Sequence, residues 1–277
     1  FTNGQQVELK AQIPLQPVTA ALVLLLGNSF LSAQIPAKPE EREVFAVRTE
    51  TPIKLDAILD EPAWARAEPA TDFLQREPFE GEPATEKTEI RVLYDDEAIY
   101  FGATVYDPEP DKLIINTLKQ DFSMSEDDGV SFYLDTFNDD RNSYAFFINP
   151  AGAKRELQAV DEGREQNVPW EDVWDVKTRI TDEGWLAEVR IPFKSLRFPD
   201  TEEQKWGINF QRRIRRRNEQ AFWSLMPRRF ISFNVSYAGN LQGMEGIRPG
   251  RNFKVKPFVT GEIRKFRGDD LDSQGDV

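Results

Sequence analysis

Cysteine and histidine are both absent from the 277 residues of this chain. The lack of cysteine excludes disulfide bonds and thiolate metal ligands. The lack of histidine removes the commonest general base, the Ser–His and Cys–His nucleophile systems and most transition-metal sites. Any bound metal must therefore be held by oxygen atoms, and calcium is the ion best suited to such ligands.

The apolar runs of the chain are short. Residues 18–26, Val-Thr-Ala-Ala-Leu-Val-Leu-Leu-Leu, fall well below the roughly 20 residues that a helix needs to cross a bilayer. Lys10 precedes this run, and Leu31-Ser32-Ala33 follows it. A basic flank, an apolar core and a small-residue cleavage site are typical of a secretory signal peptide, which we predict over residues 1–33. A buried helix of a cytosolic protein is the alternative. The charged, proline-rich residues 34–42 predict a linker.

Acidic residues outnumber basic ones by 48 to 35, which gives a net charge of −13. This excess argues against nucleic acid as a partner, because the phosphate backbone would be repelled. It suits a protein that stays soluble outside the cytoplasm. The 20 Phe, 6 Tyr and 6 Trp residues are enough for a large core with some rings left for a ligand.

Alternating apolar residues recur through the middle of the chain, as expected for strands with one buried face. They predict strands at Ile53–Leu55, Glu89–Tyr94, Ala98–Tyr106, Val130–Leu134, Tyr144–Ile148, Trp174–Thr181, Trp185–Phe193 and Trp206–Phe210, with one more near Phe222-Trp223. Asp111–Gln120 is predicted to be a short helix or a loop. Short strands, frequent turn signals and no long amphipathic helix predict an all-β sandwich over residues 43–247.

The character of the sequence changes from about Leu241. Gly243, Gly246 and Gly250 predict a connection, and Phe253–Phe266 alternates loosely like a single strand. One strand cannot fold alone. We therefore expect residues 248–277 to be a linker and the first strand of a further region.

Two tryptophans flank carboxylates in the segment Trp170–Trp174. The C–H groups of a pyranose stack on an indole ring, while carboxylates accept hydrogen bonds from its hydroxyls. If the segment is extended, Trp170 and Trp174 lie on one face and line one surface. The alternative is that one or both rings fill the core.

The run Arg212–Arg217 is followed by Asn218 and Glu219. A nucleic-acid-binding patch is a poor interpretation of this run, because the protein is acidic and is predicted to be exported. The run predicts either a cationic strand face paired with acids, or a saccharide site. In that site Arg213 or Arg215, together with Asn218 and Glu219, would offer planar donors and acceptors.

Acidic loops supply the remaining candidates. One acidic loop contains Asp127 and Asp128, and a second contains Asp135 and Asp139. Together they suggest a weak calcium site, although the second loop lacks the glycine and final glutamate of an EF-hand. Solvated turn residues are the alternative. Paired carboxylates for glycoside hydrolysis cannot be picked out among 48 acids, and we assign no catalytic residue.

Taken in order, these segments resemble the carbohydrate-binding module family 9-like domain. The resemblance covers roughly Val44 to Ile247, beginning with the motif Lys54–Trp64. It implies a jelly-roll or immunoglobulin-like β-sandwich that binds sugar-chain ends between two tryptophan rings, with structural calcium. The rings here would be Trp170 and Trp223, with Arg141 and Asn218 as polar partners. Ala57 stands where family members often have glycine.

The subgroup that this chain resembles most is attached to a bacterial outer-membrane protein with a long region thought to form a β-barrel. The chain would then be a fragment, with residues 248–277 carrying the first barrel strand. We therefore expect an exported, non-catalytic domain at the outer membrane or in the periplasm of a Gram-negative bacterium, which binds polysaccharide or oligosaccharide. The alternatives are a plug domain that binds no sugar and an accessory domain of a glycoside hydrolase acting on O-glycosyl bonds.

Overall fold

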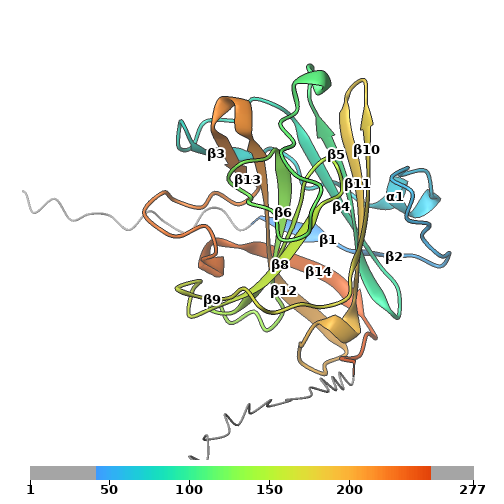
Figure 1. Cartoon of the computed structure of the whole chain (residues 1–277). Helices are drawn as coiled ribbons and strands as arrows, with labels where there is room; N and C mark the ends of the chain where they lie inside the picture. Colours follow the sequence, from blue (N-terminus) through green and yellow to red (C-terminus); the bar gives the residue numbers. More distant parts are fainter. Residues whose placement is uncertain (1–41, 251–277) are drawn as a thin grey trace, which may run out of the picture. The chain divides into compact units, whose positions relative to one another are not determined.

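The computed structural model describes residues 42–250, in which two β-sheets face each other (Figure 1). Sheet A contains, in spatial order, β1 (Glu43–Phe45), β14 (Gly239–Glu245), β12 (Glu203–Ile214), β6 (Gly129–Asp135), β7 (Ser143–Ile148), β8 (Lys154–Val160) and β9 (Glu165–Asn167). Its remaining strands are β13 (Glu219–Phe222), paired with β12, and β3 (Leu74–Glu77), paired with β13. Sheet B contains β10 (Asp175–Thr181), β11 (Gly184–Pro192), β5 (Ala98–Tyr106), β4 (Thr88–Tyr94) and β2 (Val47–Arg48). The predicted all-β sandwich is confirmed.

The helices of this part are short: α1 (Pro62–Arg66) and 3₁₀ turns at Pro110–Lys112, Phe193–Ser195, Arg215–Arg217 and Val235–Tyr237. None of the helices between residues 42 and 250 is long and apolar enough to cross a membrane. The predicted signal peptide over residues 1–33 and the strand predicted over Phe253–Phe266 lie outside the described residues, as does the predicted linker up to residue 41.

The core lies between the sheets because the inward residues of each strand are large and apolar. Phe101 of β5, Phe132 of β6 and Phe210 of β12 meet there, with ring centroids 4.9 to 6.1 Å apart. All three rings are fully buried. The edge-to-face and tilted arrangements are those that aromatic rings prefer. The period-two pattern thus places one aromatic layer between the two sheets.

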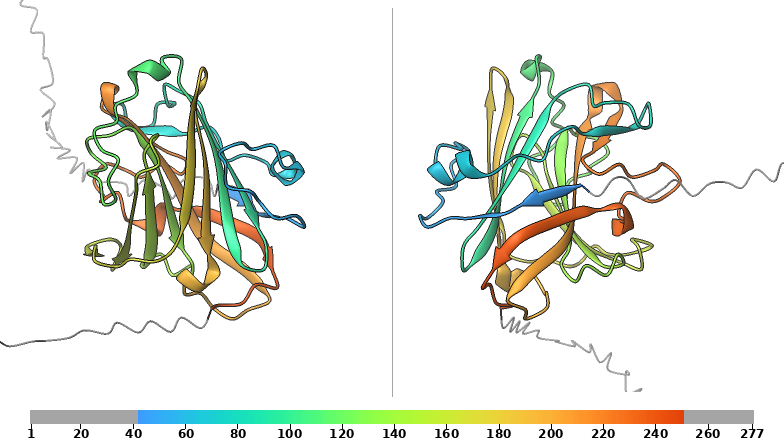
Figure 2. Two further views of the ribbon diagram at one scale, coloured as in Figure 1. Left: turned by 45° about the vertical axis from the view of Figure 1, so that its right-hand side comes forward. Right: turned by 180° about the vertical axis from the view of Figure 1, so that it is seen from behind.

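The outer face of sheet B is covered by residues 53–67, which lie on the far side of β4 and β5 from the core (Figure 2). Trp64 of α1 is buried there against Tyr100 and Leu93. A β-carbon on Gly102 would lie 2.8 Å from the Trp64 ring, so this approach requires glycine. The strand predicted at Ile53–Leu55 is not formed, because this segment crosses the sheet surface instead of pairing with it.

A buried carboxylate fixes the turn of this covering segment. Glu188 of β11 accepts hydrogen bonds from the backbone N–H groups of Asp56 and Ala57, each at 2.7 Å. Ala57 has φ +59°, the conformation that glycine adopts most readily, which explains why a glycine suits this position. Burial raises the pKa of Glu188.

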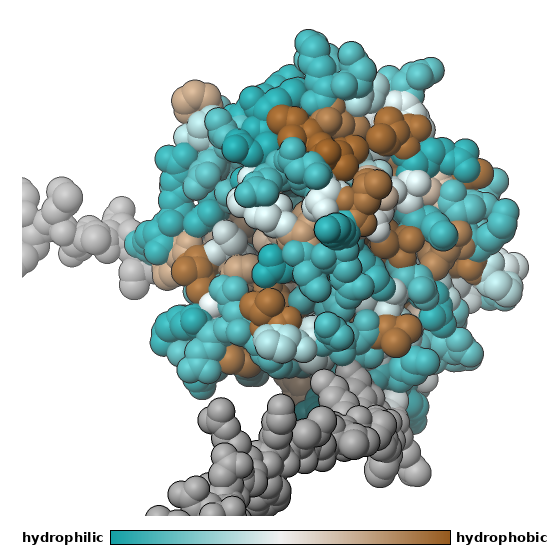
Figure 3. Space-filling view, in the orientation of Figure 1, coloured by the Kyte–Doolittle hydropathy of each residue, from teal (hydrophilic) through white to brown (hydrophobic). Residues whose placement is uncertain are grey.

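The outer face of sheet A carries a second apolar cluster. Tyr133, Phe147 and Phe222 point away from the core and are covered by Phe122 and by the loop formed by residues 224–238. In the view of Figure 3, exposed apolar residues form separate small patches within a mainly polar surface. Both outer faces are therefore partly closed by connecting segments.

Long-range pairing changes several predictions from the sequence. Of the three glycines predicted to form a connection, Gly243 lies instead within β14, which pairs with β12 through a register shift at Gln204/Trp206, whereas Gly246 and Gly250 follow the end of that strand. Gly243 has φ +85° within this irregular strand. Trp223 follows β13 instead of lying in it. Asp111–Gln120 contains the end of a single 3₁₀ turn and is otherwise a loop.

The Glu188 contact predicts a large asymmetry between two substitutions. Glu188→Ala leaves two backbone N–H groups without acceptors under the turn, and we expect it to lower the free energy of unfolding by roughly 2–5 kcal/mol. Glu188→Gln retains an acceptor oxygen and should cost clearly less. Urea unfolding of both variants measures this difference. Equal losses would show that the carboxyl group does not hold the turn through these bonds.

Candidate functional site

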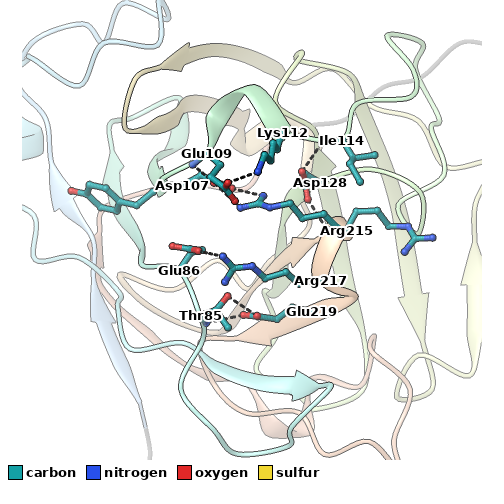
Figure 4. A network of polar contacts seen from close by, with 12 residues as sticks. Thr85, Glu86, Asp107, Glu109, Lys112, Ile114, Asp128, Arg215, Arg217 and Glu219 are labelled. Carbon is teal, nitrogen blue, oxygen red and sulfur yellow. Dashed lines mark hydrogen bonds and ion pairs between the residues drawn. The ribbon is translucent and has the colours of Figure 1, made fainter.

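Most of the arginine run where β12 turns into β13 is neutralised by acids. Arg216 donates to both oxygens of Asp107 at 2.7 Å, and Arg217 lies 2.6 Å from Glu86 (Figure 4). Arg212 is buried at the end of the core and donates to backbone carbonyls beside β4 and at the end of β5. Despite its burial, the hydrogen bonds from Arg216 lower the pKa of Asp107. For these three arginines, pairing with acids and backbone is confirmed.

Two neighbouring candidates differ in exposure. Glu219 is buried, and its two oxygens accept from the backbone N–H and the hydroxyl of Thr85 at 3.0 and 2.7 Å. Its prediction as a ligand-facing group is wrong, because strand pairing turns it toward Thr85 (Figure 4). Asn218 is exposed in a left-handed conformation and accepts a hydrogen bond from Arg215. Asn218 therefore closes the turn while remaining accessible.

Arg213 differs from its neighbours. It lies on the outer face of sheet A, on the opposite side of β12 from Arg212 and Phe210. It is the one half-buried basic side chain in residues 42–250 that has neither a hydrogen bond nor an ion pair. Burial lowers the pKa of its guanidinium, and the nearby positive charges of Arg215 and Arg76 act in the same direction. A guanidinium carries five N–H donors, so Arg213 has a large unused capacity for hydrogen bonding.

A small pocket opens beside Arg213. Its polar wall contains the side chains of Asp127, Asp128, Ser131, Gln211 and Arg213, and its apolar wall contains those of Phe122, Met124 and Phe147. The cavity measures about 10 Å³, which is room for about one water molecule. We call this the Arg213 pocket; it admits one polar substituent and not a whole ring.

The family model described as carbohydrate family 9 binding domain-like matches residues 55–221, which include all the residues that line this pocket. The chain belongs to this family. The family 9 module of Caldicellulosiruptor kristjanssonii, solved with cellotriose and with glucose, is 17% identical, with a TM-score of 0.54. The likeness covers 78% of this chain and 100% of that module. A candidate carbohydrate-binding protein of Bacteroides uniformis is 12% identical, with a TM-score of 0.57, covering 74% of this chain and 100% of that one.

These structural likenesses concern the fold, because the identities are low. Among curated proteins, endo-1,4-beta-xylanase C of Paenibacillus barcinonensis is 27% identical over 126 residues. The match covers 45% of this chain and 10% of that enzyme. The matching part of this chain therefore corresponds to only a small part of that much longer enzyme.

Two of the three candidate tryptophans of this family 9-like domain lie in its core. Trp174 is fully buried and donates to Glu156 at 3.0 Å, and Trp223 packs on Phe210 with ring centroids 5.6 Å apart. Neither ring presents a face to a ligand, so both predictions are corrected. The reason for Trp174 is local: residues 170–174 are not in a strand, because β10 begins at Asp175, and the same-face rule does not apply.

Trp170 remains partly accessible. Its ring lies 5.1 Å from that of Tyr144 and 6.0 Å from that of Phe146, at the margin of the core. Arg141 lies in the loop between β6 and β7 and pairs with Asp161 at 3.3 Å. This loop follows the end of β6 opposite to the end that pairs with Arg213, a separation of roughly 20 Å along the strand. The candidate residues are therefore divided between two regions.

The acidic candidates are also divided. Asp127 and Asp128 lie before β6, whereas Asp135 and Asp139 lie at its other end. Each carboxylate accepts bonds from nearby backbone N–H groups, as Asp128 does from Ile114 and Arg215. Within residues 42–250, no three His, Cys, Asp or Glu side chains are grouped so that they would hold a metal ion. These four acids thus do not form one site, and calcium binding stays a prediction.

The two tryptophan environments predict different costs of truncation. Trp223→Ala should lower the free energy of unfolding by roughly 3–5 kcal/mol, because it empties a core position. Trp170→Ala should cost about 1–2 kcal/mol, since the ring is only partly buried. Chemical denaturation of both variants tests this order. A reversed order would contradict the placement of the rings.

Asp135 predicts a pH dependence of stability. Burial raises its pKa to about 6, above the roughly 3.9 of an unfolded aspartate. The folded state then binds more protons between these values, so stability falls as pH rises from 4 to 6. Asp135→Asn should remove this fall and be more stable than the parent by roughly 2–3 kcal/mol at pH 8.

Asp139 provides a control of opposite sign. Although burial opposes it, hydrogen bonds from Asn142 and the Arg141 N–H lower its pKa, so its contribution to stability is lost on acidification. Thermal unfolding of Asp135→Asn and Asp139→Asn from pH 2 to 8 separates the two groups, because the contribution of Asp139 is lost only below about pH 4. If the difference in stability between the parent and Asp135→Asn is the same at every pH, Asp135 does not titrate in this window.

Proposed function

We propose that this domain binds carbohydrate without catalysing its hydrolysis, and that the Arg213 pocket takes part in the binding. We choose this site because the guanidinium of Arg213 is half-buried, has no partner and lies beside an aromatic and polar wall. Membership of a family of carbohydrate-binding domains supports the activity. The cellotriose and glucose held by the Caldicellulosiruptor module support oligosaccharides as ligands.

The pocket geometry suggests how a saccharide is held. The cavity accommodates one substituent, so the sugar ring lies over the mouth and is contacted by Phe122 and Met124. Ser131 and Gln211 lie at the wall, and Arg213 supplies a planar fork that bridges two oxygen atoms. The two carboxylates that line the pocket, Asp127 and Asp128, are held by hydrogen bonds from three backbone N–H groups and from Asn149, so neither is positioned as a free nucleophile or general acid for cleavage.

We further propose that the domain acts at the cell envelope. The signal-peptide pattern of residues 1–33 and the acidic composition support export. The resemblance to a subgroup attached to an outer-membrane protein supports a role in capturing polysaccharide there. Fractionation of the native host, followed by immunodetection of this chain, tests the location; recovery in the cytosolic fraction would contradict it.

Loss of Arg213 should weaken saccharide binding. Removal of a charged hydrogen-bond donor costs about 1.5–3 kcal/mol, equivalent to roughly a 10- to 100-fold loss of affinity. A glycan array identifies a ligand, and calorimetry then compares the parent with Arg213→Ala. We expect the variant to remain folded and the glycan to remain uncleaved.

Two further variants make this test specific. Arg141→Ala removes the same charge at the other end of β6 and should leave affinity unchanged. A loss in Trp170→Ala but not in Arg213→Ala would move the site to the partly exposed tryptophan. A folded parent that binds no glycan on the array would refute carbohydrate binding and favour the plug alternative.

A further inference from the structure

A second cavity lies at the end of β6 opposite to the Arg213 pocket. Its lining comes from the loop after β6, from the start of β7 and from β8: Thr136, Phe137, Asn142, Ser143, Tyr144, Gln158, Ala159 and Val160. We call it the Phe137 pocket. Because β6 runs from Gly129 to Asp135, the two pockets are roughly 20 Å apart along the strand.

The Phe137 pocket is large enough for a ring. Its volume is about 120 Å³, compared with about 10 Å³ for the Arg213 pocket. An apolar cavity of roughly 150 Å³ holds a benzene ring. The phenyl group of Phe137 is 51% exposed, so a ligand can also rest against it from the solvent side. A six-membered ring therefore fits where the Arg213 pocket admits only a substituent.

The lining of this pocket carries no charge. Half of its residues are aromatic or aliphatic, and the others carry only hydroxyl or amide groups. A charged ligand would find no counter-charge in the wall, and a purely apolar one would desolvate the polar groups without offering them hydrogen bonds. A neutral sugar ring meets both requirements, since its C–H groups contact aromatic surface while its hydroxyls donate and accept hydrogen bonds.

Two amides of the pocket are already oriented by neighbours. Nδ2 of Asn142 donates to Asp139 at 2.7 Å, and Oε1 of Gln158 accepts from Asn167 at 3.0 Å. An amide side chain has two N–H donors and an oxygen that accepts two hydrogen bonds. The Oδ1 acceptor of Asn142 and the N–H groups of Gln158 are not used in these bonds. Both residues thus keep capacity for the hydroxyls of a sugar.

We propose that the Phe137 pocket is a second carbohydrate site, which takes the ring of a neutral pyranose. The ring stacks on Phe137, and its hydroxyls reach Asn142 and Gln158. This inference rests on the carbohydrate-binding function proposed above, but not on the choice of the Arg213 pocket. One sugar residue cannot occupy both pockets across roughly 20 Å. A polysaccharide that reaches both is bound with higher avidity than a short oligosaccharide.

NMR of the full chain, labelled with ¹⁵N, tests the second site with the methyl glycosides of glucose, galactose and mannose. We expect at least one glycoside to shift the backbone amide signals of Phe137 and Gln158 in a saturable way. The corresponding methyl uronoside should bind at least about 10-fold more weakly, because the wall offers no positive charge. Phe137→Ala should weaken binding of the neutral glycoside by roughly 3- to 10-fold.

Phe79→Ala is the matched control, since it removes the same ring from a position that is 66% exposed and does not line the pocket. It should leave binding of the glycoside unchanged, and circular dichroism verifies that both variants are folded. Equal weakening by the two variants, or equal binding of the uronoside, would contradict a neutral sugar stacked on Phe137. If no glycoside shifts these signals while an array glycan binds the parent, the second site is refuted and the proposed function stands. Absence of both effects would refute both proposals.

Discussion

The packing of Phe101, Phe132 and Phe210 between the sheets is the contact on which the rest of this domain depends. Successive residues of a strand point to opposite faces, so the residues that fill the core determine which of their neighbours point outward. A slip of one residue in β12 would bury Arg213 and expose Phe210. The aromatic core therefore fixes the position of Arg213, although it makes no contact with a ligand.

The two outer faces of the sandwich are closed by different means. Over sheet B, residues 53–67 bring Trp64 onto Gly102, and Glu188 satisfies the backbone of the turn. This cover is apolar and tightly packed. Over sheet A, Phe122 and the 224–238 loop cover a face that contains both apolar rings and Arg213. Because Arg213 on this face has no hydrogen-bond partner among the described residues, a ligand is better served on sheet A.

The sequence was informative where one strand suffices to define a face. The span Ala98–Tyr106 and the inward set of Trp206, Ile208 and Phe210 follow from alternation alone. The same alternation extended through Arg213 places it outward, a signal available before the structure. The alternation fails two residues later, because β12 ends at Ile214 and a 3₁₀ turn redirects Arg215 and Arg217. Strand ends depend on partners distant in the sequence, which periodicity does not reveal.

The tryptophans show the same limit in another form. Trp174 and Trp223 lie just outside β10 and β13, where neither the same-face rule nor strand pairing determines the direction of the ring. Their burial depends on residues far along the chain, such as Glu156 and Phe210. The irregular strand β14 was likewise hidden, because a glycine with positive φ inside a strand looks the same in sequence as a glycine in a connection.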